Sequence, residues 1–171
     1  MPVKDSGFTL PELLTTLATL SLLATFGVPG VQQYRGNQQL AAASNTLAAT
    51  CAYARSESIK RRLPVLIVNG DGDWAGGWQV FVDLNDSDQL DPDEPLLLQE
   101  APLPNGIVAK GNSPVQHYIR YTSSGSAKLL GGAFQAGTLT LCHTSGTQAI
   151  RRLVLSASGR LRREKNAPGT C

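Results

Sequence analysis

The sequence predicts an α+β fold in which one long N-terminal helix packs on an antiparallel β-sheet head. Two observations indicate the helix: the 21 residues from Phe8 to Val28 are apolar except for Glu12 and a few small polar residues, and residues 38–59 are rich in Ala, Leu and polar helix formers. After Pro64 the pattern changes to about six short strands between Gly-rich turns. Such strands favour one antiparallel sheet, or two small sheets, packed on the helix.

The apolar run from Phe8 to Val28 is long enough to cross a bilayer, which needs about 20 residues. Gly27, Pro29 and Gly30 predict a break or kink where the helix leaves the membrane. The helix is expected to resume after Gly30 and to run to about Arg62. Pro64 then ends it, because the residue before a proline avoids the α region.

The outer half of the helix carries an apolar stripe at roughly helical spacing, which we expect to pack against the sheet. Its members are Leu40, Leu47, Cys51, Ala54 and Ile59. The basic residues 60–62 follow at the end of the helix, where cations oppose the helix dipole.

Short runs of β-forming residues follow the helix. The expected strands are Val65–Val68, Trp78–Asp83, Pro95–Gln99, Tyr118–Thr122, Gly137–Cys142 and Ile150–Ser156. In the second of these, Phe81 interrupts the alternation of apolar and polar side chains, which is typical of a strand buried on much of both faces.

The formal net charge of +2 conceals an asymmetry along the chain. Residues 71–100 hold nine acidic residues and no Lys or Arg, whereas residues 143–171 hold six basic residues against Glu164 alone. The six are Arg151, Arg152, Arg160, Arg162, Arg163 and Lys165. A basic end of this kind indicates a polyanionic partner.

The segment Gly7-Phe8-Thr9-Leu10-Pro11-Glu12 resembles the class III signal of type IV pilins and type II secretion pseudopilins. The resemblance implies that a prepilin peptidase cuts after Gly7 and methylates the new N-terminal Phe8. It also implies that Glu12 aligns subunits during assembly. The alternatives are a secretory signal peptide or a plain membrane anchor, but the leader before Phe8 has only a weak basic region.

The stretch 76–86, with Asp91 and residues 94–97 after it, resembles the head of the GspH/FimT family of minor pilins and pseudopilins. The end of the chain, Ser158-Gly159-Arg160-Leu161-Arg162, looks like the tail of the FimT kind of type IV minor pilin. There a Gly-Arg-x-Arg motif in a disulfide-tethered tail contacts DNA during uptake for natural transformation.

The resemblance implies DNA binding by Arg160 and Arg162, and the charges of Arg163 and Lys165 add them to the set. In an extended segment Arg160 and Arg162 would point the same way, and Asn166, Pro168 and Gly169 favour an open loop. Contacts to phosphates would make the binding weakly sequence-specific. Two alternatives stay open: a solvated, charge-rich C-terminus, and a minor pseudopilin of type II secretion with a structural role only.

The resemblance divides the chain into a leader (1–7), a transmembrane and filament-core helix (8–35), a head (36–159) and a basic tail (160–171). It implies a single-pass inner-membrane protein before assembly and then a subunit of a surface filament. Its partners would be other pilins, the inner membrane, the prepilin peptidase and DNA.

Three cysteines are present, and a disulfide is allowed outside the cytoplasmic membrane. We expect Cys142 to pair with Cys171, because the terminal cysteine would pin the tail to the head, and we expect Cys51 to be a buried thiol. Sequence alone leaves the connectivity open.

We expect no enzyme activity, no cofactor and no metal, because no catalytic, nucleotide-binding or Cys-x-x-Cys motif occurs in the sequence. Some oxygen-bearing side chains do fall at positions 1, 3, 5, 7, 9 and 12 of a calcium loop of the EF-hand kind. They are Asp83, Asn85, Ser87, Gln89, Asp91 and Glu94. Position 6 is Asp88 where glycine is required, so a plain acidic hairpin loop is the expectation.

Overall fold

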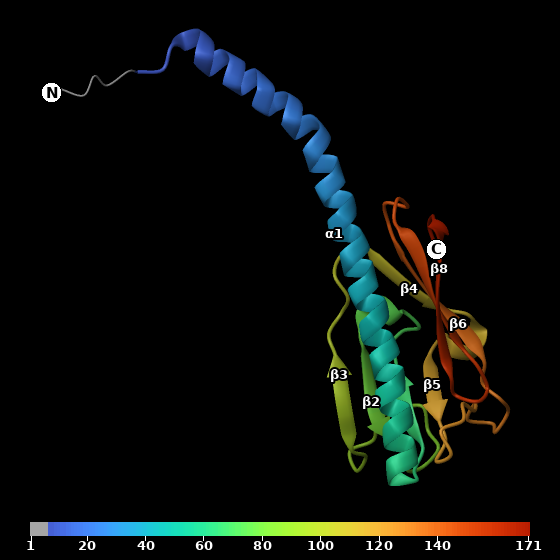
Figure 1. The fold of residues 1–171 in the computed structure, drawn as a ribbon. Helices are drawn as coiled ribbons and strands as arrows, with labels where there is room; N and C mark the ends of the chain where they lie inside the picture. Colours follow the sequence, from blue (N-terminus) through green and yellow to red (C-terminus); the bar gives the residue numbers. More distant parts are fainter. Residues whose placement is uncertain (1–6) are drawn as a thin grey trace. The chain divides into compact units, whose positions relative to one another are not determined.

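The computed structural model describes residues 7–171, without the side chains of residues 26–29 (Figure 1). The expected leader therefore lies outside the described residues, apart from Gly7. The chain divides into two compact units, Met1–Arg35 and Gly36–Cys171. The second unit is the head and contains all the strands.

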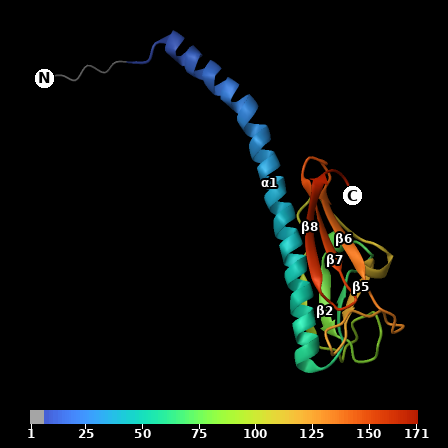
Figure 2. The ribbon, with the colours of Figure 1, turned by 45° about the vertical axis from the view of Figure 1, so that its right-hand side comes forward.

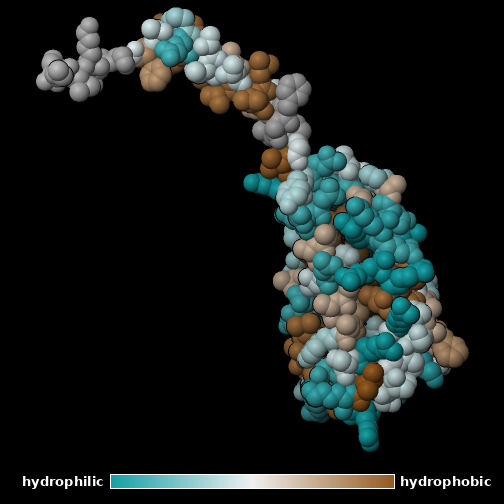
Figure 3. All heavy atoms as spheres, viewed as in Figure 1, coloured by the Kyte–Doolittle hydropathy of each residue, from teal (hydrophilic) through white to brown (hydrophobic). Residues whose placement is uncertain are grey.

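One helix, α1, runs from Leu10 to Arg61. Of the break or kink expected at Gly27, Pro29 and Gly30, the break is wrong, because these residues continue the helix. The kink stays a prediction. A proline removes one N–H donor from the ladder of backbone hydrogen bonds, and the helix continues through it here. Among the described residues, α1 holds the one segment long and apolar enough to cross a membrane. Hydrophobic side chains gather along its first half, whereas the visible surface of the head is mainly hydrophilic (Figure 3).

The part of α1 that belongs to the head buries one face. Leu40, Leu47, Cys51 and Ala54 are in the core as expected, but Ile59 is 48% exposed. The buried face continues instead through Ser58, which is fully buried. The apolar stripe therefore follows the helical period as far as Ala54, and Ile59 lies outside the buried face.

Two four-stranded antiparallel sheets make up the rest of the head. The first has the order β3-β2-β1-β5 and is formed by Leu96–Glu100, Trp78–Val82, Val65–Val68 and Tyr118–Tyr121. Trp78, Val80 and Val82 belong to the main core, and Phe81 is fully buried too. This strand is thus buried on both faces, as its imperfect alternation indicated.

The second sheet has the order β4-β6-β7-β8. Its strands are Ile107–Gly111, Gly137–His143, Ala149–Leu155 and Leu161–Pro168. Short 3-10 helices, η1 (Trp74–Gly76) and η2 (Ser113–Val115), lie in the connections. The sequence did not reveal β4, which is short and ends in glycine, or β8, whose charged residues are typical of a solvated tail.

The expected open tail is therefore wrong: most of residues 160–171 form β8, an edge strand hydrogen-bonded to β7. An edge strand tolerates charged side chains, and Pro168 is acceptable at its end because the missing N–H of a proline there removes at most one hydrogen bond of the ladder. Figure 2 shows β8 running beside α1.

The acidic β2–β3 loop is held by a buried arginine. Arg120 on β5 pairs with Asp86, and its Nε lies 3.5 Å from Oδ2 of Asp83. Burial nevertheless raises the pKa of the Asp83 carboxyl, because desolvation outweighs the attraction of Arg120. Among the described residues, no group of three or more His, Cys, Asp or Glu side chains is arranged to hold a metal ion.

Candidate functional site

The turn between β7 and β8 is fixed against α1 by backbone contacts. Gly159 has φ +76°, and a Cβ atom there would lie 2.0 Å from the carbonyl oxygen of Gly125, so only glycine fits. Arg55 of α1 donates from Nε to the Gly125 carbonyl at 2.9 Å and from Nη2 to the Ser158 carbonyl at 3.1 Å. The start of β8 is therefore anchored to the helix.

The basic residues of β8 divide between the two faces of the sheet. Side chains two apart share a face, so Arg162 lies with Glu164, and its Nη2 is 2.6 Å from the Glu164 carboxylate. Arg163 lies opposite Leu153, and Lys165 opposite Arg151, on the face that holds the core. Two of the four predicted DNA-binding residues, Arg163 and Lys165, thus face α1.

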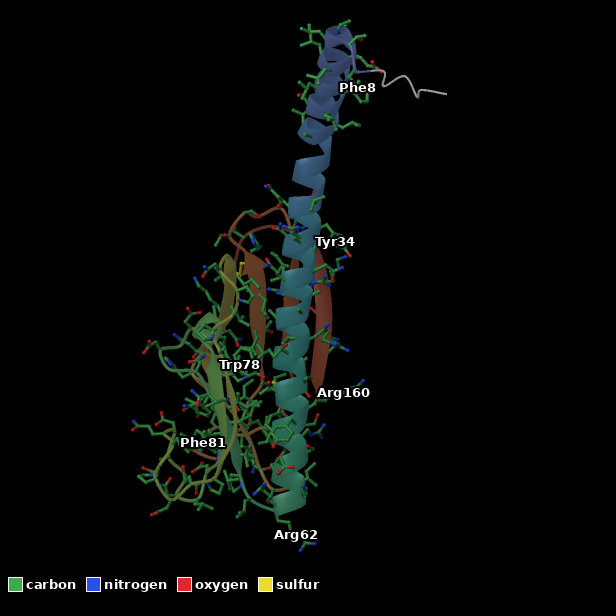
Figure 4. The ribbon with its side chains drawn as sticks, turned by 90° about the vertical axis from the view of Figure 1, so that its left-hand side faces the viewer. Phe8, Tyr34, Arg62, Trp78, Phe81 and Arg160 are labelled. Atoms are coloured by element: carbon green, nitrogen blue, oxygen red, sulfur yellow. A yellow bond between two sulfur atoms is a disulfide. The ribbon has the colours of Figure 1, made fainter. Side chains whose placement is uncertain are left out.

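Arg160 precedes β8 in the turn and borders a hollow between α1 and β8 together with Arg163, whereas Arg162 is not part of the lining. The shared orientation of Arg160 and Arg162 stays a prediction. Figure 4 shows Arg160 beside α1. The hollow has a volume of about 590 Å³, and Ala48, Ala52 and Leu161 line it.

Arg163 also connects the strand directly to the helix, because its Nη1 donates to Oδ1 of Asn45 at 3.0 Å. We call the line of contact between α1 and β8, from Asn45 and Arg163 to Arg55 and Arg160, the basic seam. Apolar side chains line the seam and cationic side chains border it, which suits an extended anionic ligand.

A disulfide joins Cys142 of β6 to Cys171, as expected, with the two Cα atoms 5.7 Å apart. The last residues after β8 must therefore return across β7 to reach β6. Cys51 is a free and buried thiol whose pKa rises to about 12, because burial disfavours the thiolate. A hydrogen bond with Tyr121 opposes this rise only in part.

Basic residues are concentrated on the second sheet of the head. The strands of the second sheet and the β7–β8 turn carry seven basic residues, which are Lys110 and the six between Arg151 and Lys165, against Glu164 alone. The predicted binding set omitted Lys110, Arg151 and Arg152. The adjacent pair Arg151-Arg152 in a predicted strand was the signal, since one of two successive side chains must face the same side as Leu153.

The residues predicted for processing and assembly lie at the start of the described chain. Gly7 and Phe8 precede α1, with Phe8 83% exposed, and Glu12 is exposed in the first helical turn. An acidic side chain at this end complements the helix dipole.

The family model described as "Type II transport protein GspH" matches residues 43–159. Two solved structures with similar folds are the type IV minor pilin FimU of Pseudomonas aeruginosa and the minor pseudopilin EpsH of Vibrio cholerae. FimU is 24% identical, with a TM-score of 0.58 over 74% of this chain and 89% of that one. EpsH is 13% identical, with a TM-score of 0.53 over 74% of this chain and 97% of that one. No curated protein sequence matches the chain.

Proposed function

Because the chain belongs to the GspH family and is thus a minor pilin or pseudopilin, we propose that it is a minor subunit of a type IV pilus that binds DNA. The binding serves the uptake of extracellular DNA for natural transformation. The ligand contacts are made by Arg160, Arg162, Arg163 and Lys165 to phosphate groups.

The charge of the second sheet is the observation that carries this proposal. Seven basic residues against one acidic residue form a local excess that suits a polyanion, and contacts to phosphates need only well-placed Lys and Arg. Arg160, Arg162 and Lys165 are exposed, so their charged groups are accessible to a ligand. None of the four predicted residues needs a particular base for such contacts, so the binding is weakly sequence-specific.

We propose the pilin life cycle for the N-terminal segment. A prepilin peptidase removes residues 1–7 and methylates Phe8, α1 anchors the subunit in the inner membrane, and Glu12 aligns it with other pilins during assembly. The exposed apolar side chains along the first half of α1 support this, because they require either lipid or neighbouring helices around them.

A titration of short mixed-sequence duplex DNA with the full chain in neutral detergent tests the DNA proposal. At two salt concentrations, affinity should fall steeply with salt, and replacing Arg160, Arg162, Arg163 and Lys165 together by glutamine should nearly abolish it. A matched control replaces Lys60, Arg61 and Arg62, which lie at the C-terminal end of α1 and do not line the hollow. Unchanged affinity in the fourfold variant would refute the proposal.

The second candidate is a minor pseudopilin of type II secretion with a structural role only. The coverage of almost the whole EpsH chain supports it. Complementation separates the two in host strains that lack only the corresponding minor subunit of either system: restored transformation supports the pilin, and restored secretion supports the pseudopilin.

A further inference from the structure

A second hollow opens where the basic seam meets the middle of β7 and β8. Its volume is about 310 Å³. It is lined by Ala41, Ser44 and Asn45 of α1, and by Arg151, Arg163 and Lys165 of the sheet. Glu164 also borders it, but the carboxylate of Glu164 is bound to Arg162 at 2.6 Å. Asn45 and Arg163 border both hollows, so this pocket continues the seam.

The three cations of this pocket lie together without a counterion. Arg151 and Lys165 are direct partners across the antiparallel pair β7–β8, and Arg163 lies two residues along the same face. Within the part of the chain that the structure describes, none of the three has a carboxylate within ion-pair distance. Like charges directly opposite each other destabilise a sheet, and a bound anion would remove that cost.

The Arg151 guanidinium has one unsatisfied donor. Its Nε atom is buried and has no hydrogen-bond partner, which is unusual for a buried donor. Asn45 accepts from Arg163 through Oδ1, which leaves the Nδ2 amide of Asn45 as a further donor at the same hollow. Donors from two strands and one helix therefore converge on a space whose acidic neighbour, Glu164, is already paired with Arg162.

We propose that this pocket binds a phosphate group of the nucleic acid backbone, with Arg151 as its central ligand. The inference rests on the proposed DNA binding and adds a contact on β7 to those proposed at the end of the chain. A guanidinium can donate two parallel hydrogen bonds to phosphate oxygens, which suits Arg151 and Arg163. Lys165 adds a third positive charge beside them, and the ligand is a phosphodiester.

The test compares Arg151→Gln with Arg152→Gln in the full chain, in neutral detergent, by titration with short duplex DNA. The two variants remove the same charge at adjacent positions of β7, but Arg152 lies on the opposite face. Arg151→Gln should weaken binding about tenfold, as expected for a lost charged hydrogen bond. It should also reduce the slope of log affinity against log salt by about 0.9, whereas Arg152→Gln should change affinity at most about twofold.

Arg151→Lys should restore part of the affinity, because it keeps the charge without the fork of donors. Equal losses in Arg151→Gln and Arg152→Gln would mean diffuse attraction and would overturn the pocket, as would wild-type affinity in Arg151→Gln. Unfolding curves of both variants report whether the sheet is intact.

Inorganic phosphate, followed by phosphorus NMR, distinguishes the sources of the ligand. If the wild-type chain binds phosphate but not DNA, and Arg151→Gln abolishes the phosphate binding, the DNA function is refuted. The pocket is then reassigned to a free phosphate ligand. A chain that binds DNA with Arg151→Gln at full affinity would keep the proposed function and refute the pocket alone.

Discussion

The indole Nε1 of Trp78 donates a hydrogen bond to Oγ1 of Thr50 at 3.2 Å, and both side chains are buried. The bond joins β2 to the face of α1 that packs on the sheets. Trp78 lies beside the helix in Figure 4. Its ring packs near that of Trp74, with the ring centroids 6.3 Å apart. The contact thus links one polar helix residue to the aromatic part of the core.

Thr50→Val should lower the free energy of unfolding by about 1–3 kcal/mol, because it leaves the buried indole N–H without an acceptor. Thr50→Ser is the control, since it keeps the hydroxyl and loses only a methyl group. Chemical denaturation followed by tryptophan fluorescence measures both. A Val variant as stable as the wild type would mean that the hydrogen bond contributes no net stability.

A left-handed backbone conformation costs an L residue about 1–2 kcal/mol, and Gly159→Ala should destabilise the head by more than this. The added Cβ would also meet the Gly125 carbonyl oxygen at 2.0 Å. Gly132→Ala is the matched control, since Gly132 has φ +83° with nothing within 4 Å of its Cβ position. Thermal melting of the two variants isolates the cost of the close approach, and equal melting temperatures would contradict it.

Loss of the disulfide should lower stability without moving the basic strand. The bridge spans 29 residues in sequence, which corresponds to about 3–4 kcal/mol in the chain-entropy account. Cys171→Ser should therefore melt at lower temperature and should no longer respond to reductant. Because β8 remains paired with β7 from Leu161 to Lys165, DNA affinity should change little. A large loss of affinity would mean that the bridge itself orders the seam.

The buried thiol of Cys51 should make the head less stable at alkaline pH. The thiol pKa is 9.0 in the unfolded reference and about 12 in the folded protein, so above pH 9 the unfolded state loses a proton that the folded state keeps. Stability therefore falls between pH 9 and 12 by about 1.4 kcal/mol per pH unit from this group. Cys51→Ala should remove this part of the pH dependence in urea titrations. Parallel curves for the two proteins would contradict the assignment.

Processing of the N-terminus should be visible in protein from its native host. Mass spectrometry should show loss of residues 1–7 and one added methyl group on Phe8. A variant with a bulky residue at Gly7 should keep the leader, as a control for specific cleavage. An intact leader in assembled filaments would refute the pilin life cycle.

The sequence predicted most of the fold because its signals are local. The strand Val65–Val68 has the bounds expected, and the helix ends one residue before its expected end. The errors arose where tertiary context overrides a local rule. β8 looks like a solvated tail, and only its pairing with β7 makes it a strand. Pro29 and its neighbouring glycines look like a helix break, yet α1 continues through them.

The candidate site was harder to predict than the fold. The sequence identified the basic end of the chain, but it could not show that Arg163 faces Asn45, which is 118 positions away. It also gave no sign that Lys165 lies opposite Arg151, because register depends on the turn at Gly159. Long-range pairing of this kind has no local signature.

The acidic residues around β2 and β3 and the basic residues of the second sheet are separated in the head, which gives it an electric dipole moment. Residues 71–100, which supply two strands of the first sheet and the acidic loop between them, carry nine carboxylates, and the second sheet with its β7–β8 turn carries seven basic residues. A dipolar head rotates in the field of an approaching polyanion before any contact forms, which raises the rate of productive encounters. The same field repels anions from the acidic loop. Association should therefore be fast and oriented at low ionic strength, and it should become slow and random in direction as salt shortens the reach of the field.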